Sequence, residues 1–268
     1  MLPFWVSIGV LSLVQGALVA LPRPPVAIPL LSRLQGRWWA LVLPLSIVVV
    51  IAAIALDSAS ARFLTWLALI AVPPLAAAAL GWIVHGARPF LALAAIPLFA
   101  VAWAAKGELG GQSCALALSA LACVTLGWLL VCVVPARWVK LGIYAMAAVD
   151  AYLVFTELLQ EPNTTLNAAA PAANLPKLQL VDWGSALMGF GDIFIAAVLG
   201  ALLARDPRLQ PRGALLAALL CCAWDLLFFA IDTTPATVPI ALTLLTLELW
   251  FRYRPREPSA PRSASRTA

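Results

Sequence analysis

Long apolar runs, each bounded by charged residues, prolines or glycines, recur along the whole chain. Each run is close to the ~20 residues that an α-helix needs to cross the ~30 Å hydrocarbon layer of a bilayer. Their number excludes a soluble protein with a single membrane anchor. The pattern predicts an all-α polytopic membrane protein of about nine transmembrane helices, at residues 2–21, 38–56, 63–84, 89–105, 114–134, 138–159, 183–204, 212–231 and 235–251.

The spans belong to one transmembrane domain at residues 1–254, with no separate soluble domain. The longest connection, at 160–182, is rich in Pro, Asn and Ala, and we expect it to be irregular or partly extended. The alternation around Leu178 and Leu180 predicts a short strand there. Residues 255–268 are rich in Pro, Ser and Arg, which predicts a disordered cytoplasmic tail.

The composition agrees with a membrane protein. Hydrophobic residues make up 63% of the chain and charged residues 11%, and the mean hydropathy is +0.98. A soluble domain of this length needs far more charged surface to cover its core. The lipid bilayer is therefore the predicted surrounding of most of the chain.

The positions of the basic residues predict an orientation. Of the 17 lysines and arginines, all but Arg62, Lys106 and Lys177 fall on one side of the predicted spans. The basic side of a membrane protein faces the cytoplasm. The N-terminus is then outside and the C-terminus is cytoplasmic. The net charge of +5 is explained by this topology, and we expect no nucleic-acid partner because no basic cluster accompanies a recognisable binding module.

The cysteines do not predict a metal site. The three at Cys114, Cys123 and Cys132 are nine residues apart, so each is rotated by half a turn from the last on a helix. They cannot converge on one metal from one helix. Cys221 and Cys222 also lie in an apolar span, and we expect all five to be small packing residues. No metal and no cofactor are predicted.

Two intramembrane carboxylates are the first candidates for chemistry, because an acid in the bilayer core is costly and marks a functional site by default. Asp150 lies nine residues before the outer end of one predicted span, and Asp192 lies nine residues after the outer start of the next. Both would sit about 13 Å below the outer surface, on antiparallel neighbouring helices. Asp225, on the following span, is better explained by a polar contact to another helix.

Two carboxyl groups a few ångströms apart in a low dielectric share a proton and titrate as a pair. One can then take a proton from water while the other donates to a carbonyl oxygen, as in aspartic proteases. Depth alone leaves three alternatives open. The pair can be catalytic, it can hold two helices together, or it can bind ions or protons in a transporter or channel.

The segment Gly189-Phe190-Gly191-Asp192 favours catalysis, because two glycines beside the carboxyl let another backbone approach it. Together with Asp150 one span earlier, and with Pro235-Ala236-Thr237 at the start of the last span, it resembles the GxGD intramembrane aspartyl proteases, the presenilin and signal peptide peptidase family. The resemblance covers the nine-span topology, while its motifs lie in the last 120 or so residues.

The resemblance implies an intramembrane aspartic endopeptidase with a presenilin-like fold. It makes Asp150 and Asp192 the catalytic pair. It assigns substrate binding to a second set of residues, namely Tyr152, Gly189, Phe190, Gly191, Pro235, Ala236 and Thr237. The chain departs from the family at Val149, where a tyrosine is usual, and at Thr237, where a leucine is usual, so a catalytically inactive relative is a further alternative.

The predicted orientation is similar to that of signal peptide peptidase and opposite to that of presenilin. It implies substrates that have their N-terminus inside, such as leftover signal peptides or single-span signal anchors. The stretch at 177–181, just before the second catalytic span, is a candidate to pair with an extended substrate as an added strand. The sequence indicates neither the oligomeric state nor a partner subunit.

Overall fold

The computed structural model describes residues 2–26, 29–57, 59–169 and 175–253, so the predicted tail at 255–268 lies outside the described residues. The elements are α1 (Phe4–Ala20), α2 (Pro29–Ser32), the 3₁₀-helix η1 (Arg37–Leu41), α3 (Val42–Leu56), α4 (Ala59–Ala78), the π-helical turn η2 (Ala79–Ile83), the 3₁₀-helix η3 (Pro89–Ala94), α5 (Ala95–Ala104), α6 (Leu109–Val133), α7 (Ala136–Phe155), α8 (Gln160–Ala168), β1 (Leu180–Trp183), β2 (Ala186–Gly189), α9 (Phe190–Leu203), α10 (Leu209–Asp225), the 3₁₀-helix η4 (Leu226–Phe229) and α11 (Val238–Tyr253).

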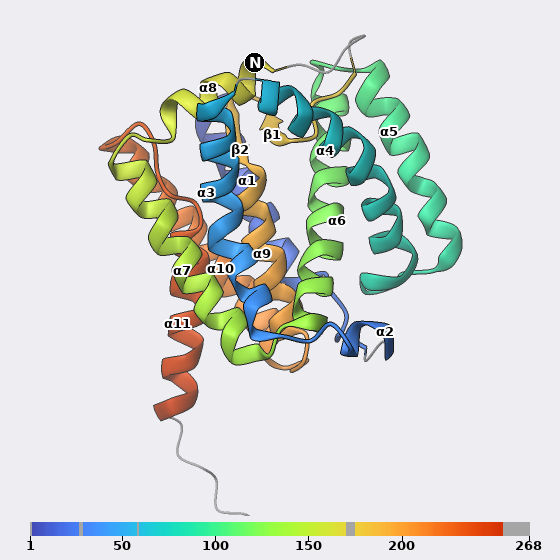
Figure 1. Ribbon diagram of the computed structural model, residues 1–268, viewed down its shortest axis with the longest axis vertical. Coiled ribbons are helices and arrows are strands. Elements are labelled where there is room, and N and C mark those ends of the chain that lie inside the picture. Colours follow the sequence, from blue (N-terminus) through green and yellow to red (C-terminus); the bar gives the residue numbers. More distant parts are fainter. Residues whose placement is uncertain (1, 27–28, 58, 170–174, 254–268) are drawn as a thin grey trace, which may run out of the picture.

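The protein is a helical bundle, and Figure 1 shows most of its long helices running roughly along one direction. Within the described residues, five helical segments are long and apolar enough to cross a membrane, namely Arg37–Leu56, Ala59–Ile83, Leu109–Val133, Ala136–Phe155 and Leu209–Phe229. Four apolar helices are shorter, at Phe4–Ala20, Pro89–Ala104, Phe190–Leu203 and Val238–Trp250. The prediction of a helical protein with several potential membrane spans is confirmed.

Helix α9 occupies the centre of the bundle and packs against α1, α6, α7, α10 and α11. All residues from Ile195 to Leu203 are buried, which the uniformly apolar sequence of this helix allows. Small residues set the close packing around it. A Cβ added at Gly127 of α6 would lie 2.8 Å from the backbone N of Val198, and one added at Gly200 would lie 2.5 Å from the carbonyl O of Leu18.

The second predicted catalytic span begins later than predicted. Residues 183–189 were expected to be helical, but they belong to an antiparallel hairpin in which Trp183 pairs with Ala186 and Leu180 pairs with Gly189. Gly184 adopts a positive φ of 66° in the turn, which a glycine adopts without strain. The predicted start was wrong because the apolar residues of this stretch fit a strand as well as a helix.

The hairpin turn is fixed to two helices. Ser7 of α1 accepts a hydrogen bond from the backbone N–H of Ser185 at 3.1 Å. Gln112 of α6 accepts one from the N–H of Gly184 at 2.9 Å. These contacts hold β1 and β2 at the end of the bundle, directly before α9 (Figure 1).

The connection at 160–182 is more ordered than predicted. It contains helix α8 as well as the start of β1, and the strand lies at Leu180–Trp183, slightly later than predicted. Pro162 occupies the first turn of α8, where its missing N–H has no helical partner to lose. Thr164 and Thr165 direct their hydroxyls to the carbonyl O of Glu161, so local hydrogen bonds accompany this polar helix.

We predict that Gly16→Ala destabilises the protein by about 1–3 kcal/mol, because the added methyl must displace α10. A Cβ at Gly16 would lie 2.6 Å from the Cβ of Ala218 and 3.1 Å from the carbonyl O of Ala214. Gly9→Ala on the same helix is the matched control, since nothing lies within 4 Å of its Cβ position. Thermal unfolding of both variants in detergent tests this, and equal melting temperatures would contradict close packing at Gly16.

Candidate active site

Asp192 lies in the first turn of α9, immediately after the hairpin. Its Oδ2 accepts a hydrogen bond from the backbone N–H of Gly189 at 3.0 Å, so the carboxyl caps the start of its own helix. Gly189 is extended, which lets β2 run directly into α9. The Asp192 carboxyl is therefore held by the backbone at the start of α9. The predicted span had placed Asp192 in the middle of a helix.

Asp150 lies on α7, about one and a half turns before the helix ends at Phe155, and only 5% of it is exposed. Its Oδ2 accepts a hydrogen bond of 2.6 Å from the hydroxyl of Thr237. Thr237 is itself fully buried, just before α11 begins at Val238. The segment before the last helix thus contacts the first carboxyl directly.

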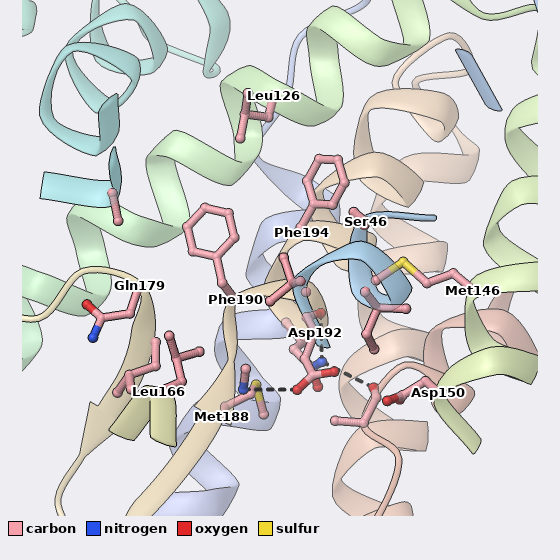
Figure 2. Close-up of a pocket in the computed structure, with 18 of the residues that line it drawn as sticks. Ser46, Leu126, Met146, Asp150, Leu166, Gln179, Met188, Phe190, Asp192 and Phe194 are labelled. Carbon is pink, nitrogen blue, oxygen red and sulfur yellow. Dashed lines mark hydrogen bonds between the residues drawn. The ribbon is translucent and has the colours of Figure 1, made fainter. Parts of the chain in front are cut away.

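Both carboxyl groups line one cavity of about 860 Å³, and they are close enough to interact electrostatically. Figure 2 shows Asp150 and Asp192 side by side, reaching the cavity from different elements. The remaining walls are mainly apolar and come from α3, α4, α6 and the hairpin, with Val50, Leu67 and Leu187 among the lining residues. Two acids therefore stand in a space large enough for several apolar side chains.

The side chain of Gln15 connects the site to the first helix. Its Nε2 donates to the carbonyl O of Asp192 at 3.1 Å and to the carbonyl O of Ala236 at 3.3 Å. Gln15 is 1% exposed, so this amide is buried between α1, α9 and the segment before α11. One side chain therefore sets the distance between two parts of the site.

The structure brings most of the predicted site residues together. Gly189, Phe190, Gly191 and Ala236 line the cavity with the two aspartates. A Cβ at Gly191 would lie 3.2 Å from the Cε of Met146, which also lines the cavity, so the absence of a side chain keeps α7 and α9 close.

Three predicted residues are not part of the cavity wall. Thr237 instead contacts Asp150 from behind the wall, and Pro235 is buried beside Ala236. Tyr152 is not brought to the site as predicted, since its side chain is 63% exposed and does not line the cavity. Two residues along a helix turn a side chain by about 200°, so Tyr152 faces away from Asp150.

Three polar residues at the site were not assigned to it from the sequence. Ser12 and Gln15 lie on one face of α1 and are both buried. The hydroxyl of Ser12 donates to Oδ2 of Asp225 at 2.7 Å, which confirms that Asp225 makes a polar contact to another helix. Asp225 also reaches the cavity. The spacing of Ser12 and Gln15 in an otherwise apolar run was the signal that could have identified this face.

No group of three or more His, Cys, Asp or Glu side chains that could hold a metal ion occurs in the part of the chain that the structure describes. The site combines the carboxyl groups of Asp150 and Asp192 with the hydroxyl of Thr237 at a mainly apolar cavity. Such a pair can move protons between water and a bound carbonyl group.

We predict that Gln15→Leu lowers the stability of the folded protein by about 1–3 kcal/mol, because the carbonyl groups of Asp192 and Ala236 lose their donor in a buried place. Gln15→Glu, with a similar shape, should destabilise less than Gln15→Leu, since a buried carboxyl is protonated and can still donate to one of the two carbonyl groups. Thermal unfolding in detergent measures both. Wild-type stability in Gln15→Leu would contradict this role of the amide.

A scan against models of known protein families, a search of curated proteins and a search of solved structures each found no match for this chain. The function of the site is therefore inferred from its own residues and their geometry.

Proposed function

We propose that this protein is an intramembrane aspartyl protease that hydrolyses peptide bonds with Asp150, Asp192 and an activated water. The observation that carries the proposal is that the two carboxyl groups, from α7 and α9, line one cavity in an apolar helical bundle. The resemblance to the GxGD family supports it, because the segments that carry the motifs, GFGD and Pro235–Thr237, meet at this cavity. The proposed site needs no metal or cofactor.

The reaction uses one ionised and one protonated carboxyl group. The ionised group takes a proton from water as the water oxygen attacks the peptide carbonyl carbon, and the protonated group gives its proton to the carbonyl oxygen. The tetrahedral intermediate then returns one hydroxyl proton to the carboxylate that gave it. The amide nitrogen takes the proton that the first carboxyl group had removed from water as the C–N bond breaks, so a carboxylic acid and an amine leave and the pair is restored.

The substrate must be extended at the bond that is cleaved, because a helix hides its carbonyl groups in hydrogen bonds. The edge of β2 is a place where such a segment can bind. Trp183 and Ala186 close the turn, and Asp182 lies opposite Leu187 in the next pair. In an antiparallel ribbon the backbone groups of successive residues point alternately toward the other strand and away from it. Leu187 therefore presents its N–H and C=O to the outer edge of β2.

Leu187 also lines the cavity, and from it the cavity wall follows the chain without interruption to Asp192. A segment paired with this edge would continue toward Asp192, and Gly189 and Gly191 would let its backbone approach the carboxyl. The part of the protein proposed to pair with the substrate is therefore the outer edge of β2, in place of the stretch at 177–181.

The proposal includes nine membrane crossings. The five long segments and the four shorter apolar helices match the nine predicted spans in order, which supports this count. The distribution of lysine and arginine supports a cytoplasmic C-terminus and an external hairpin. Substrates would then be signal peptides or single-span proteins whose N-terminus is inside.

We predict that Asp150→Asn and Asp192→Asn each abolish cleavage, because neither variant retains two carboxyl groups that can exchange protons. Purified protein is incubated with a single-span substrate in detergent or bilayer nanodiscs, and the products are identified by mass spectrometry. Asp225→Asn is the matched control, since its amide oxygen can still accept from Ser12, and it should retain cleavage.

Cleavage that survives both dyad substitutions would rule out the proposed chemistry. A transporter or channel predicts flux of protons or ions into proteoliposomes without cleavage, so the same preparations are assayed for flux. Neither cleavage nor flux in the folded wild-type protein would favour an inactive relative.

We predict that Thr237→Val lowers the rate of cleavage by about tenfold or more, because a hydrogen bond to a charged group contributes about 1.5–3 kcal/mol. Valine keeps the shape of threonine but removes the hydroxyl that donates to Asp150. Thr237→Ser keeps the hydroxyl and should retain most of the rate. Equal rates in the valine and serine variants would show that the hydroxyl does not act on Asp150.

A further inference from the structure

A second, smaller groove lies along α7, on the N-terminal side of Asp150. Its volume is about 260 Å³, and it is formed by η1 and the start of α3 on one side and by the first turns of α7 on the other. The walls include Trp38, Leu41, Trp138, Leu141 and Ala145. It lies at the end of the bundle opposite the β1–β2 hairpin (Figure 1), so it would meet the boundary between lipid tails and headgroups.

Arg37 lines this groove, and Arg137 adjoins it through its contact with the Trp138 ring. The guanidinium of Arg37 lies 5.0 Å from the centre of the Trp38 ring, and that of Arg137 lies 5.6 Å from the centre of the Trp138 ring. Both arginines are exposed, and within the described part of the chain neither forms an ion pair with a carboxylate. Their N–H donors therefore remain available to an anion.

The neighbouring Lys140, unlike these two arginines, has an acidic partner among the described residues of the chain. Its Nζ lies 2.7 Å from Oε1 of Glu248, whose Oε2 accepts a hydrogen bond from the hydroxyl of Tyr144 at 2.9 Å. That carboxylate is already held between α7 and α11. The positive charge of Arg37 and Arg137 is thus left for a ligand from outside the chain.

We propose that this groove binds an anionic phospholipid. The phosphate would lie between Arg37 and Arg137, because guanidinium groups bind phosphate oxygens with two parallel hydrogen bonds. An acyl chain would follow the apolar wall along Leu141 and Ala145. Basic pockets between transmembrane helices on the cytoplasmic side bind acidic lipid headgroups in this way. A free phosphate ion would leave the apolar wall unused.

The lipid would contact both α3 and α7, which already approach closely here. A Cβ added at Gly142 would lie 2.8 Å from Cδ1 of Leu43 and 3.0 Å from the carbonyl O of Ala40. A ligand that binds the folded chain across this junction raises its thermal stability. Binding can therefore be measured without an assay of the proposed activity.

The test measures binding of phosphatidylglycerol and phosphatidylcholine to the full-length protein in detergent, by native mass spectrometry and by thermal unfolding. The wild-type protein should prefer phosphatidylglycerol, and Arg37→Gln with Arg137→Gln should weaken that preference by about tenfold or more. The charge-matched control is Arg88→Gln with Arg208→Gln, which removes two exposed arginines elsewhere in the described chain. It should keep the preference, and an equal loss in both double variants would overturn the proposal.

A second variant tests the apolar wall without changing charge. Ala145 is exposed in the groove, so Ala145→Phe should fold, fill the space and weaken phosphatidylglycerol binding. Glycerol phosphate, the soluble headgroup, should neither raise the melting temperature nor compete at equal concentration. Wild-type lipid binding in Ala145→Phe, or competition by glycerol phosphate as strong as by the lipid, would overturn a lipid site in this groove.

Discussion

A polar group that is buried among apolar side chains is costly unless it forms a hydrogen bond. The residues around the cavity follow this constraint. Ser12 donates to Asp225, Thr237 donates to Asp150, and Gln15 donates to two carbonyl groups. Each bond joins segments that are far apart in the chain. These few contacts help to set how α1, α7, α9 and the start of α11 lie relative to one another.

The same constraint explains why α9 can be short. Its fourteen residues reach only about 21 Å, less than the hydrocarbon thickness. The hairpin before it pairs those backbone groups that face the other strand, and Asp192 satisfies the N–H of Gly189 where the strand becomes a helix. Neighbouring helices surround α9, so its ends need not face lipid. Within a bilayer, backbone that is not helical is tolerated only where protein or a cavity encloses it.

The apolar runs predicted the helical elements well, because the thickness of a bilayer acts on the local sequence. The start of α9 was predicted wrongly, since the turn at Gly184 depends on Ser7 and Gln112, which lie far away in the chain. The approach of Asp150 to Asp192 could be predicted from their order on consecutive helices, although Asp192 lies in the first turn of α9 and not nine residues inside a helix. The role of Gln15 could not, because its partners lie 177 and 221 residues away.

Thr237 shows how a departure from a family pattern can have a local physical reason. A leucine at this position, as the GxGD family usually has, would offer Asp150 no side-chain hydrogen bond. The threonine hydroxyl approaches Oδ2 to 2.6 Å in a fully buried place, where an unpaired carboxyl is expensive. Cavity walls that are mainly apolar leave few other donors for Asp150. The hydroxyl therefore gives Asp150 a donor that its apolar surroundings lack.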